Sequence, residues 1–271
     1  MKINKILKDK KNIQLKYQIL SEILNINITK LKVNKEKNIT ILEYLKFIKI
    51  YSKAKKDYPI QYLLKKAYFY DNYYYVNKNV LIPRPETEIL VNEAIELIKK
   101  SITNPKILEI GTGSGIIAIT LKKEFKNSIV TATEISKKAL KVAKYNAKNN
   151  KTNIDFINTN ICDGIDKKYN VLISNPPYID YNDINIEEKV KKYEPHLALF
   201  AKNNGLYFYE EILKKSKEVL EEENIILFEI GYNQKELLTK IVNNHFPKAK
   251  IIVKKDYNDY DRIMIIKNNI E

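Results

Sequence analysis

The strongest constraint on the fold is an alternation of short apolar strands and amphipathic helices, which begins near residue 105 and continues to the end of the chain. The apolar runs are short enough for buried strands, and the segments between them repeat apolar residues at three-to-four spacing. The expected strands are 107–110, 129–133, 155–157, 171–173, 225–230, 251–253 and 263–266, and the expected helices are 116–124, 136–149, 205–222 and 233–244. This order predicts an α/β fold with a doubly wound, mostly parallel, seven-stranded sheet, closed by a pair formed from the last two strands.

The first 65 residues have the periodicity of helices rather than of strands. Thr40 and Glu43 have the spacing of a capping box, in which each residue satisfies a free backbone N–H of the other at the start of a helix. The apolar residues expected on that helix are Leu42, Leu45 and Ile48. The sequence therefore predicts a small helical domain ahead of the α/β alternation.

An aromatic segment at 68–76, interrupted by Asp71-Asn72, predicts a β-hairpin between these two parts. A helix follows Pro83 and Pro85, because proline is well tolerated in the first turn of a helix. We expect a helical substrate-recognition domain at 1–66, a hairpin linker at 67–80 and the α/β domain at 81–271.

Composition and charge narrow the class of protein. No apolar run reaches the length of about 18 residues that a membrane-spanning helix needs, and the N-terminus lacks the features of a secretory signal. The single cysteine, Cys162, excludes an intrachain disulfide framework. The net charge of +15 comes from dispersed lysines with few arginines, which is not typical of a specific DNA-binding face. We expect a monomeric, cytoplasmic protein that binds neither a membrane nor a specific DNA sequence.

The first motif that indicates chemistry is a glycine-rich turn between an expected strand and an expected helix. It consists of Gly111, Thr112, Gly113, Ser114 and Gly115. Glycines at the carboxyl end of a parallel strand let the backbone approach a ligand closely. A dinucleotide fingerprint would need a further glycine where Ile116 stands.

Two acidic residues accompany this turn. Glu109 precedes it, and the resulting pattern is similar to the first motif of class I methyltransferases. Glu134 ends the next strand, where a carboxylate accepts hydrogen bonds from the hydroxyls of a ribose. The turn and Glu134 together predict a ligand that contains adenosine.

The most specific motif is Asn175-Pro176-Pro177-Tyr178, which follows the expected strand at 171–173. Two prolines fix the backbone and remove two donors, so carbonyl groups remain free to accept hydrogen bonds. Asn175 offers a donor and an acceptor, and Tyr178 offers a flat aromatic face. This combination suits a planar NH2 group whose nitrogen must be held in line with a methyl donor.

These motifs occur in one order with further segments at 81–88, 194–195, 229–231 and 261–262, and the combination resembles the release-factor glutamine methyltransferase family (PrmC/HemK). The resemblance implies a Rossmann-like methyltransferase sheet and S-adenosylmethionine as cofactor, with no metal. It implies methylation of the glutamine amide in the Gly-Gly-Gln motif of class I peptide-chain release factors, which are the expected partners in translation termination.

The resemblance also assigns roles to residues. Cofactor binding is expected at Glu109, Gly111, Thr112, Gly113, Ser114, Gly115, Glu134, Ile161 and Asn175. The catalytic motif is Asn175, Pro176, Pro177 and Tyr178, which also binds the substrate together with Arg84 and Glu86. The chain departs from the family pattern at Lys65, where glycine is usual.

Three alternatives remain open at the level of sequence. A related enzyme methylates glutamine in a ribosomal protein, although the segment 81–88 favours the release-factor branch. An adenine amino-methyltransferase also suits an Asn-Pro-Pro-Tyr turn, but such enzymes flip the base and use a target-recognition module that is not evident here. A non-catalytic adaptor would bind a release factor or ribosome through the basic surface.

Overall fold

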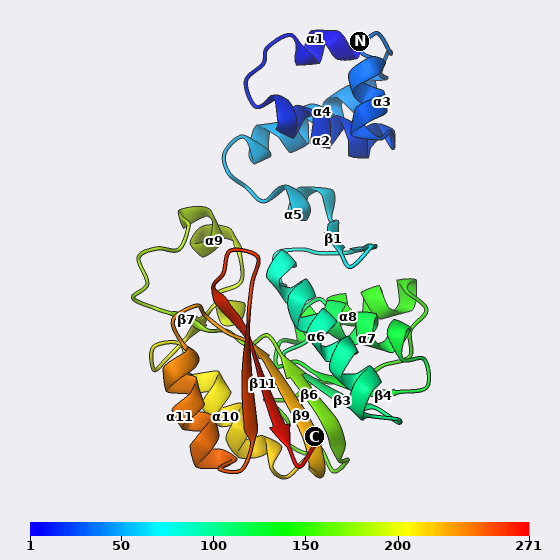
Figure 1. The fold of residues 1–271 in the computed structure, drawn as a ribbon. Coiled ribbons are helices and arrows are strands. Elements are labelled where there is room, and N and C mark those ends of the chain that lie inside the picture. The colour runs from blue at the N-terminus through cyan, green and yellow to red at the C-terminus, as the bar shows by residue number, and fades with distance from the viewer. Residues whose placement is uncertain (271) are drawn as a thin grey trace. The chain divides into compact units, whose positions relative to one another are not determined.

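The computed structural model describes residues 1–270 and contains two compact units. One unit comprises Met1–Lys66 with Glu187–Tyr193, and the other comprises Ala67–Ile186 with the chain from Glu194 onward. The second unit contains the α/β fold and every residue of the site described below (Figure 1).

A seven-stranded sheet forms the centre of the α/β unit, with the strand order β10-β11-β9-β6-β3-β4-β5. Its strands are β3 (Lys106–Ile110), β4 (Ile129–Thr133), β5 (Asp155–Ile157), β6 (Tyr169–Ser174), β9 (Leu220–Glu229), β10 (Lys250–Lys255) and β11 (Asp261–Asn268). Strands β5, β4, β3, β6 and β9 run parallel, while β11 is antiparallel to both β9 and β10. The predicted doubly wound, mostly parallel sheet with its closing pair is confirmed.

Helices cover both faces of this sheet, as Figure 1 shows. They are α6 (Pro85–Ser101), α7 (Ile116–Glu124), α8 (Lys137–Asn149), α10 (Tyr207–Ser216) and α11 (Lys235–His245). Neighbouring residues of one strand enter different cores: Ile107 packs with α6 and α7, whereas Leu108 packs with α10 and α11. This alternation follows from the period of two in a strand, and it explains why the strands are apolar on both faces.

The expected helix at 205–222 was wrong at its C-terminal end. Helix α10 ends at Ser216, and β9 begins at Leu220, which pairs with Tyr169 of β6. The glutamates that follow Leu220 favour a helix by intrinsic propensity, but pairing with the central sheet outweighs this local preference.

Several short elements between β6 and α10 were not predicted from periodicity. They are β7 (Ile179–Asp180), α9 (Glu188–Tyr193), the 3-10 helix η1 (His196–Ala198) and β8 (Phe200–Ala201). Strands β7 and β8 pair in parallel outside the main sheet. Elements of two or three residues are too short to show a hydrophobic period, and the six residues of α9 bury no side chain that could mark one.

Residues 1–66 of the N-terminal unit contain five helices: α1 (Ile3–Leu7), α2 (Ile13–Leu24), α3 (Ile28–Val33), α4 (Ile41–Ala54) and α5 (Ile60–Leu64). The capping box at the start of α4 is confirmed: Glu43 N–H donates to Thr40 Oγ1 at 3.2 Å, and Thr40 N–H donates to Glu43 Oε2 at 2.7 Å. The helix buries Phe47 and Ile50, whereas the apolar residues that marked it in the sequence, Leu42, Leu45 and Ile48, are exposed.

The predicted hairpin consists of β1 (Ala67–Phe69) and β2 (Asn72–Tyr74). Its turn lies at Tyr70 and Asp71, one residue earlier than expected, and both residues have positive φ angles, as a type I′ turn requires. Lys65, at the end of α5, has a left-handed backbone with φ of 54°. That conformation accounts for the glycine found at this position in the family that the sequence resembles.

Helix α6 begins at Pro85, as expected, and buries Leu90, Val91 and Ala94.

No helix within residues 1–270 combines the length and apolar character needed to cross a bilayer.

Candidate active site

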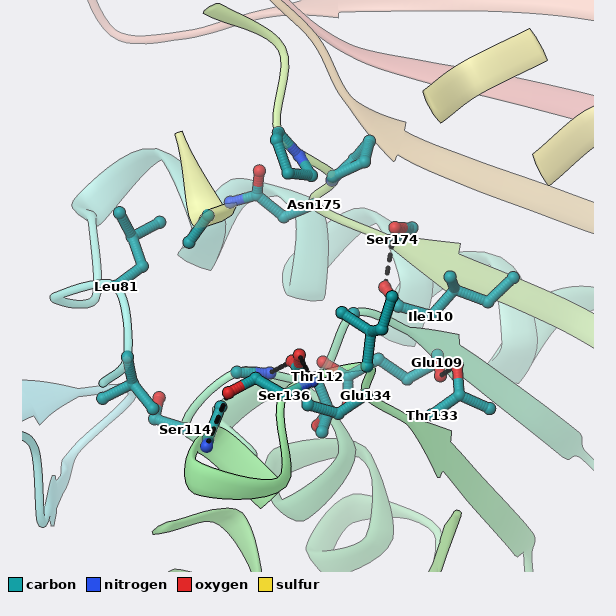
Figure 2. Close-up of a pocket in the computed structure, with 18 of the residues that line it drawn as sticks. Leu81, Glu109, Ile110, Thr112, Ser114, Thr133, Glu134, Ser136, Ser174 and Asn175 are labelled. Carbon is teal, nitrogen blue, oxygen red and sulfur yellow. Dashed lines mark hydrogen bonds between the residues drawn. The ribbon is translucent and has the colours of Figure 1, made fainter. Parts of the chain in front are cut away.

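A cavity of about 200 Å³ opens at the carboxyl ends of β3, β4 and β6. Its wall includes the glycine-rich turn after β3, residues 133–136 after β4, residues 174–177 after β6 and the loop at 79–84 ahead of α6. Figure 2 shows Glu134 and Asn175 in this one pocket, although they come from different strands. The topology therefore brings together the two motifs that the sequence singled out, at the edge where open α/β sheets bind ligands.

The three glycines of the turn have different functions. All have positive φ angles, and a Cβ added to Gly111 or Gly113 would meet no atom within 4 Å. A Cβ on Gly115 would lie 3.1 Å from Cβ of Ala143, and Gly115 is not part of the cavity wall that the described residues form. Gly111 and Gly113 therefore provide open space for a ligand, whereas Gly115 permits close packing of α7 against α8.

Glu109 lies in the cavity wall and stabilises the turn. Its Oε2 accepts hydrogen bonds from Thr112 Oγ1 at 2.7 Å and from the backbone N–H of Ala118 at 3.0 Å. Burial raises the pKa of Glu109 to about 8. The hydrogen bonds from Thr112 and Ala118 favour the charged form and oppose this shift. Glu109 thus fixes the shape of the turn while only 1% of its surface is exposed.

The raised pKa of Glu109 predicts that the difference in stability between wild type and Glu109→Gln depends on pH. Between about pH 4.5 and pH 8 the unfolded chain loses this proton and the folded chain keeps it, so stability falls as the pH rises. Glu109→Gln resembles the protonated form and lacks this contribution. We expect the melting temperature of wild type to fall by a few degrees relative to Glu109→Gln between pH 5 and pH 8. A constant difference across that range, measured by thermal unfolding, would contradict the raised pKa.

Glu134 connects the glycine turn to the start of α8. Its Oε2 accepts from the backbone N–H of Gly113 at 2.9 Å, and its Oε1 accepts from the backbone N–H of Ser136 at 2.9 Å. Burial raises its pKa, while hydrogen bonds from Ser136, Gly113 and Ile135 oppose that shift. A mostly buried carboxylate with further lone pairs, beside glycines that leave open space, fits the vicinal hydroxyls of an adenosyl group.

We expect Glu134→Ala to weaken binding of S-adenosylmethionine by about 1.5–3 kcal/mol, or roughly 10- to 150-fold in Kd. The loss combines missing hydrogen bonds to the ligand with a loosened Gly113. Glu134→Gln keeps the shape and one acceptor, so its Kd should lie between those of Glu134→Ala and wild type. Calorimetry on the purified proteins gives the three constants, and an unchanged Kd for Glu134→Ala would mean that Glu134 acts only on the backbone.

Ile161 lies in the cavity wall in a strained conformation. Its φ is 56°, which is unfavourable for a β-branched residue. Such strain persists where surrounding contacts determine the conformation, and it is concentrated at ligand sites. Ile161 therefore presents a fixed apolar surface to the cavity beside Asn160, which also lies in the wall.

The Asn-Pro-Pro-Tyr turn forms the opposite part of the site. Asn175, Pro176 and Pro177 lie in the wall of the cavity. Nδ2 of Asn175 donates to Thr87 Oγ1 at 3.1 Å and to Glu229 Oε2 at 2.8 Å. The expectation that Asn175 both donates to and accepts from a ligand is therefore wrong for this arrangement: the two amide hydrogens are already engaged, and Oδ1 remains as the acceptor.

We expected Tyr178 to offer its aromatic face to the cavity, and this expectation was wrong. Tyr178 is not among the described residues of the wall, and its hydroxyl donates to Glu229 Oε1 at 3.2 Å. Burial raises its pKa, and the nearby charge of Glu229 adds to the shift. The phenol therefore supports the turn from inside the protein. Glu229 was present in the sequence pattern, but periodicity and motif spacing gave it no role.

Arg84 and Glu86 lie in different surroundings. Arg84 lines the cavity and forms an ion pair with the buried Glu194, at 2.6 Å from Nη2 to Oε1. The other oxygen of Glu194 accepts from the backbone N–H of Ile82 at 3.1 Å. Glu86 lies in the first turn of α6, outside the described cavity wall. Glu194 thus fixes the loop ahead of α6 in place, a role that the sequence alone did not assign.

Two further side chains that could carry chemistry, Cys162 and His196, do not line the cavity formed by the described residues. Cys162 is buried in the core on the α10 side, and burial raises its pKa to about 11. His196 is exposed and packs edge-on against Phe200. The described residues contain no cluster of three metal-ligating side chains.

Comparison with known proteins agrees with this geometry. Residues 87–192 match the family model described as a methyltransferase small domain. The release factor glutamine methyltransferase of Mycoplasma mycoides subsp. mycoides is 40% identical over 258 residues, which cover 93% of this chain and 91% of that protein. The protein of the same name from Staphylococcus aureus is 44% identical over 215 residues, which cover 77% of this chain and 76% of the relative.

Among solved structures, a methyltransferase from Pyrococcus furiosus has a TM-score of 0.52 and 19% identity, with 72% of this chain and 87% of that chain covered. This likeness supports the Rossmann-like methyltransferase fold. The identity to these two relatives extends over 93% and 77% of the chain. The identity to these relatives, together with the motifs of the chain itself, shows that the chain belongs to the release factor glutamine methyltransferase family.

Proposed function

We propose that the chain transfers a methyl group from S-adenosylmethionine to the side-chain amide nitrogen of the glutamine in the Gly-Gly-Gln motif of class I peptide-chain release factors. The observation that carries this proposal is Asn175, whose amide hydrogens are engaged by Thr87 and Glu229, in the same cavity as Glu134 and the glycine-rich turn. One part of the cavity is suited to an adenosyl group and another presents an acceptor to an NH2 group. The names of the curated relatives agree with this activity.

Each part of the site has a defined task in this reaction. Bound S-adenosylmethionine supplies an electrophilic methyl group on a sulfonium centre. Gly111 and Gly113 let the backbone approach the cofactor, and Glu134 accepts hydrogen bonds from its ribose. Ile161 supplies an apolar surface for the adenine.

At the acceptor end, Oδ1 of Asn175 and the carbonyl groups of the proline turn accept the hydrogens of the glutamine amide. An amide nitrogen is a poor nucleophile because its lone pair is delocalised into the carbonyl group. Acceptors that orient both hydrogens direct the remaining lone pair toward the methyl group, which lowers the barrier by orientation and electrostatics. As the nitrogen–carbon bond forms, the carbon–sulfur bond would break with its electron pair left on sulfur, and the nitrogen would lose one of its two hydrogens as a proton to water.

The wider roles follow from this activity. We propose that residues 1–66 form the substrate-recognition domain, that 67–80 link it to the catalytic domain at 81–271, and that Arg84 and Glu86 help to order the substrate. The enzyme would act as a monomer in the cytoplasm, in translation termination, without specific binding to DNA or membranes.

The deciding experiment incubates the purified chain with methyl-labelled S-adenosylmethionine and one acceptor at a time. An intact release factor should be labelled, and the same factor with its Gly-Gly-Gln glutamine changed to alanine should not. Ribosomal protein and duplex DNA are parallel acceptors. Preferential labelling of either of these would favour the ribosomal-protein or adenine enzyme, and cofactor-independent binding to the release factor without labelling would favour an adaptor.

A further inference from the structure

Glu229, the last residue of β9, lies at the centre of a buried cluster behind the Asn-Pro-Pro-Tyr turn. Only 1% of its surface is exposed. Its Oε2 accepts from Thr87 Oγ1 at 2.7 Å and from Asn175 Nδ2 at 2.8 Å, and its Oε1 accepts from the hydroxyl of Tyr178 at 3.2 Å. One carboxylate thus receives hydrogen bonds from α6, from the first residue of the turn and from its last residue.

These contacts decide which end of the Asn175 amide is engaged behind the turn and which end is left for a ligand. A carboxamide is nearly symmetric in shape, and a rotation of 180° would exchange its donor and acceptor ends. Thr87, Asn175 and Tyr178 all donate to the carboxyl oxygens of Glu229, so the group acts here as an acceptor and pairs with the NH2 end of the amide. Thr87 gives its own hydrogen to Glu229, and its oxygen is therefore available to accept the second hydrogen of Asn175.

The main chain around Glu229 is fixed as well. Its carbonyl oxygen accepts from the hydroxyl of Tyr209 at 2.8 Å, and β9 lies inside the sheet between β6 and β11. The carboxylate is therefore attached to one of the most constrained positions of the fold. Buried polar clusters in which every member is satisfied are rigid, and they hold one arrangement of donors and acceptors.

We propose that Glu229 is a positioning residue that sets the polarity of Asn175, so that the site presents an acceptor to the reacting nitrogen and selects an NH2 group. This inference rests on the proposed function, because the acceptor nitrogen is taken to be an amide. Glu229 does not line the cavity and acts through Asn175 and Tyr178.

The kinetic test is a mutant cycle in the release-factor methylation assay. Glu229→Gln replaces an acceptor-only group with one that also donates, and we expect kcat to fall by about tenfold or more, with Kd for S-adenosylmethionine within about threefold of wild type. On an Asn175→Ala, Tyr178→Phe background the same change should cost less than about twofold, because the groups through which Glu229 acts are already absent. An equal loss of kcat on both backgrounds would overturn the proposal.

Two further variants separate positioning from folding. Thr87→Val removes one acceptor of Asn175 and should lower kcat by a smaller factor than Glu229→Gln. Asn224→Ala alters another buried polar residue of β9, which accepts from Nδ2 of Asn268 and contacts neither Asn175 nor Tyr178. It should lower the melting temperature and leave kcat within about twofold. A loss of kcat in Asn224→Ala equal to that in Glu229→Gln would indicate a general effect on stability.

A measurement without substrate distinguishes failure of this inference from failure of the proposed function. The side-chain NH2 protons of Asn175, assigned by their loss in Asn175→Ala, should exchange slowly with solvent in wild type. They should exchange at least about tenfold faster in Glu229→Gln. Unchanged exchange would refute the role of Glu229 even if the release factor is methylated. Absence of methylation in wild type would refute the proposed function alone.

Discussion

Asn175→Ala is expected to lower the turnover of release-factor methylation by about a hundredfold or more, while Kd for S-adenosylmethionine changes by less than about threefold. The alanine removes Oδ1, the acceptor that is left over once Nδ2 has bonded to Thr87 and Glu229, and it leaves Pro176 and Pro177 to hold the turn. Misplacement of the reacting nitrogen by about 1 Å is enough to cause a loss of this size.

Two further variants test the same interpretation of the Asn-Pro-Pro-Tyr turn. Asn175→Asp keeps the shape and the acceptors but places a second carboxylate against Glu229, so we expect turnover to remain very low. Tyr178→Ala should cost less than Asn175→Ala, because the tyrosine supports the turn and does not line the described cavity. Near-normal turnover by Asn175→Ala in a methyl-incorporation assay would show that the interpretation of the turn is wrong.

Gly205→Ala is the second change for which we expect a large effect. Gly205 has φ of +82°, and a Cβ there would lie 2.0 Å from the carbonyl oxygen of Tyr178 and 2.5 Å from Nε2 of Gln234. That carbonyl normally accepts from Gln234 Nε2 at 3.0 Å, so the alanine would displace the end of the Asn-Pro-Pro-Tyr turn. Left-handed strain and overpacking together predict a loss of about 2–5 kcal/mol in stability. Turnover should fall by at least about tenfold.

Gly164→Ala is the matched control. Gly164 has φ of +72°, but a Cβ there would meet nothing within 4 Å. Gly164→Ala should lose only about 1–2 kcal/mol in stability, which is the cost of placing alanine in a left-handed backbone conformation, and it should retain turnover. Denaturant unfolding and the methylation assay on both variants give the comparison, and equal losses in the two would exclude a steric contact at Tyr178.

The sequence predicted those parts of the molecule whose patterns are local. Strand β4 and helix α7 were predicted to the residue, because an apolar run and a helical period are visible within one short window. The family resemblance assigned both Asn175 and Glu134 to cofactor binding, and both lie in the wall of one cavity at the carboxyl ends of parallel strands.

The parts that were missed depend on partners far away in the chain. Leu220 is part of a strand because Tyr169 pairs with it, and no local pattern shows this. The orientation of the Asn175 amide depends on Thr87 and Glu229, and the loop at Arg84 depends on Glu194. Burial of a polar side chain can be decided only once the fold is known, so Glu229 and Glu194 appeared as ordinary acids in the sequence.

The distances along the chain between hydrogen-bonded partners have a consequence for synthesis on the ribosome. Gly113 and Glu134 are 21 residues apart, whereas Ile82 and Glu194 are 112 apart and Thr87 and Glu229 are 142 apart. The contact between the glycine turn and Glu134 can therefore form within a short emerging segment, while the contacts of Thr87 and Asn175 with Glu229 must wait until β9 has been synthesised. A nascent chain would thus form the part of the cavity around Glu134 before it gains the carboxylate that bonds to Asn175.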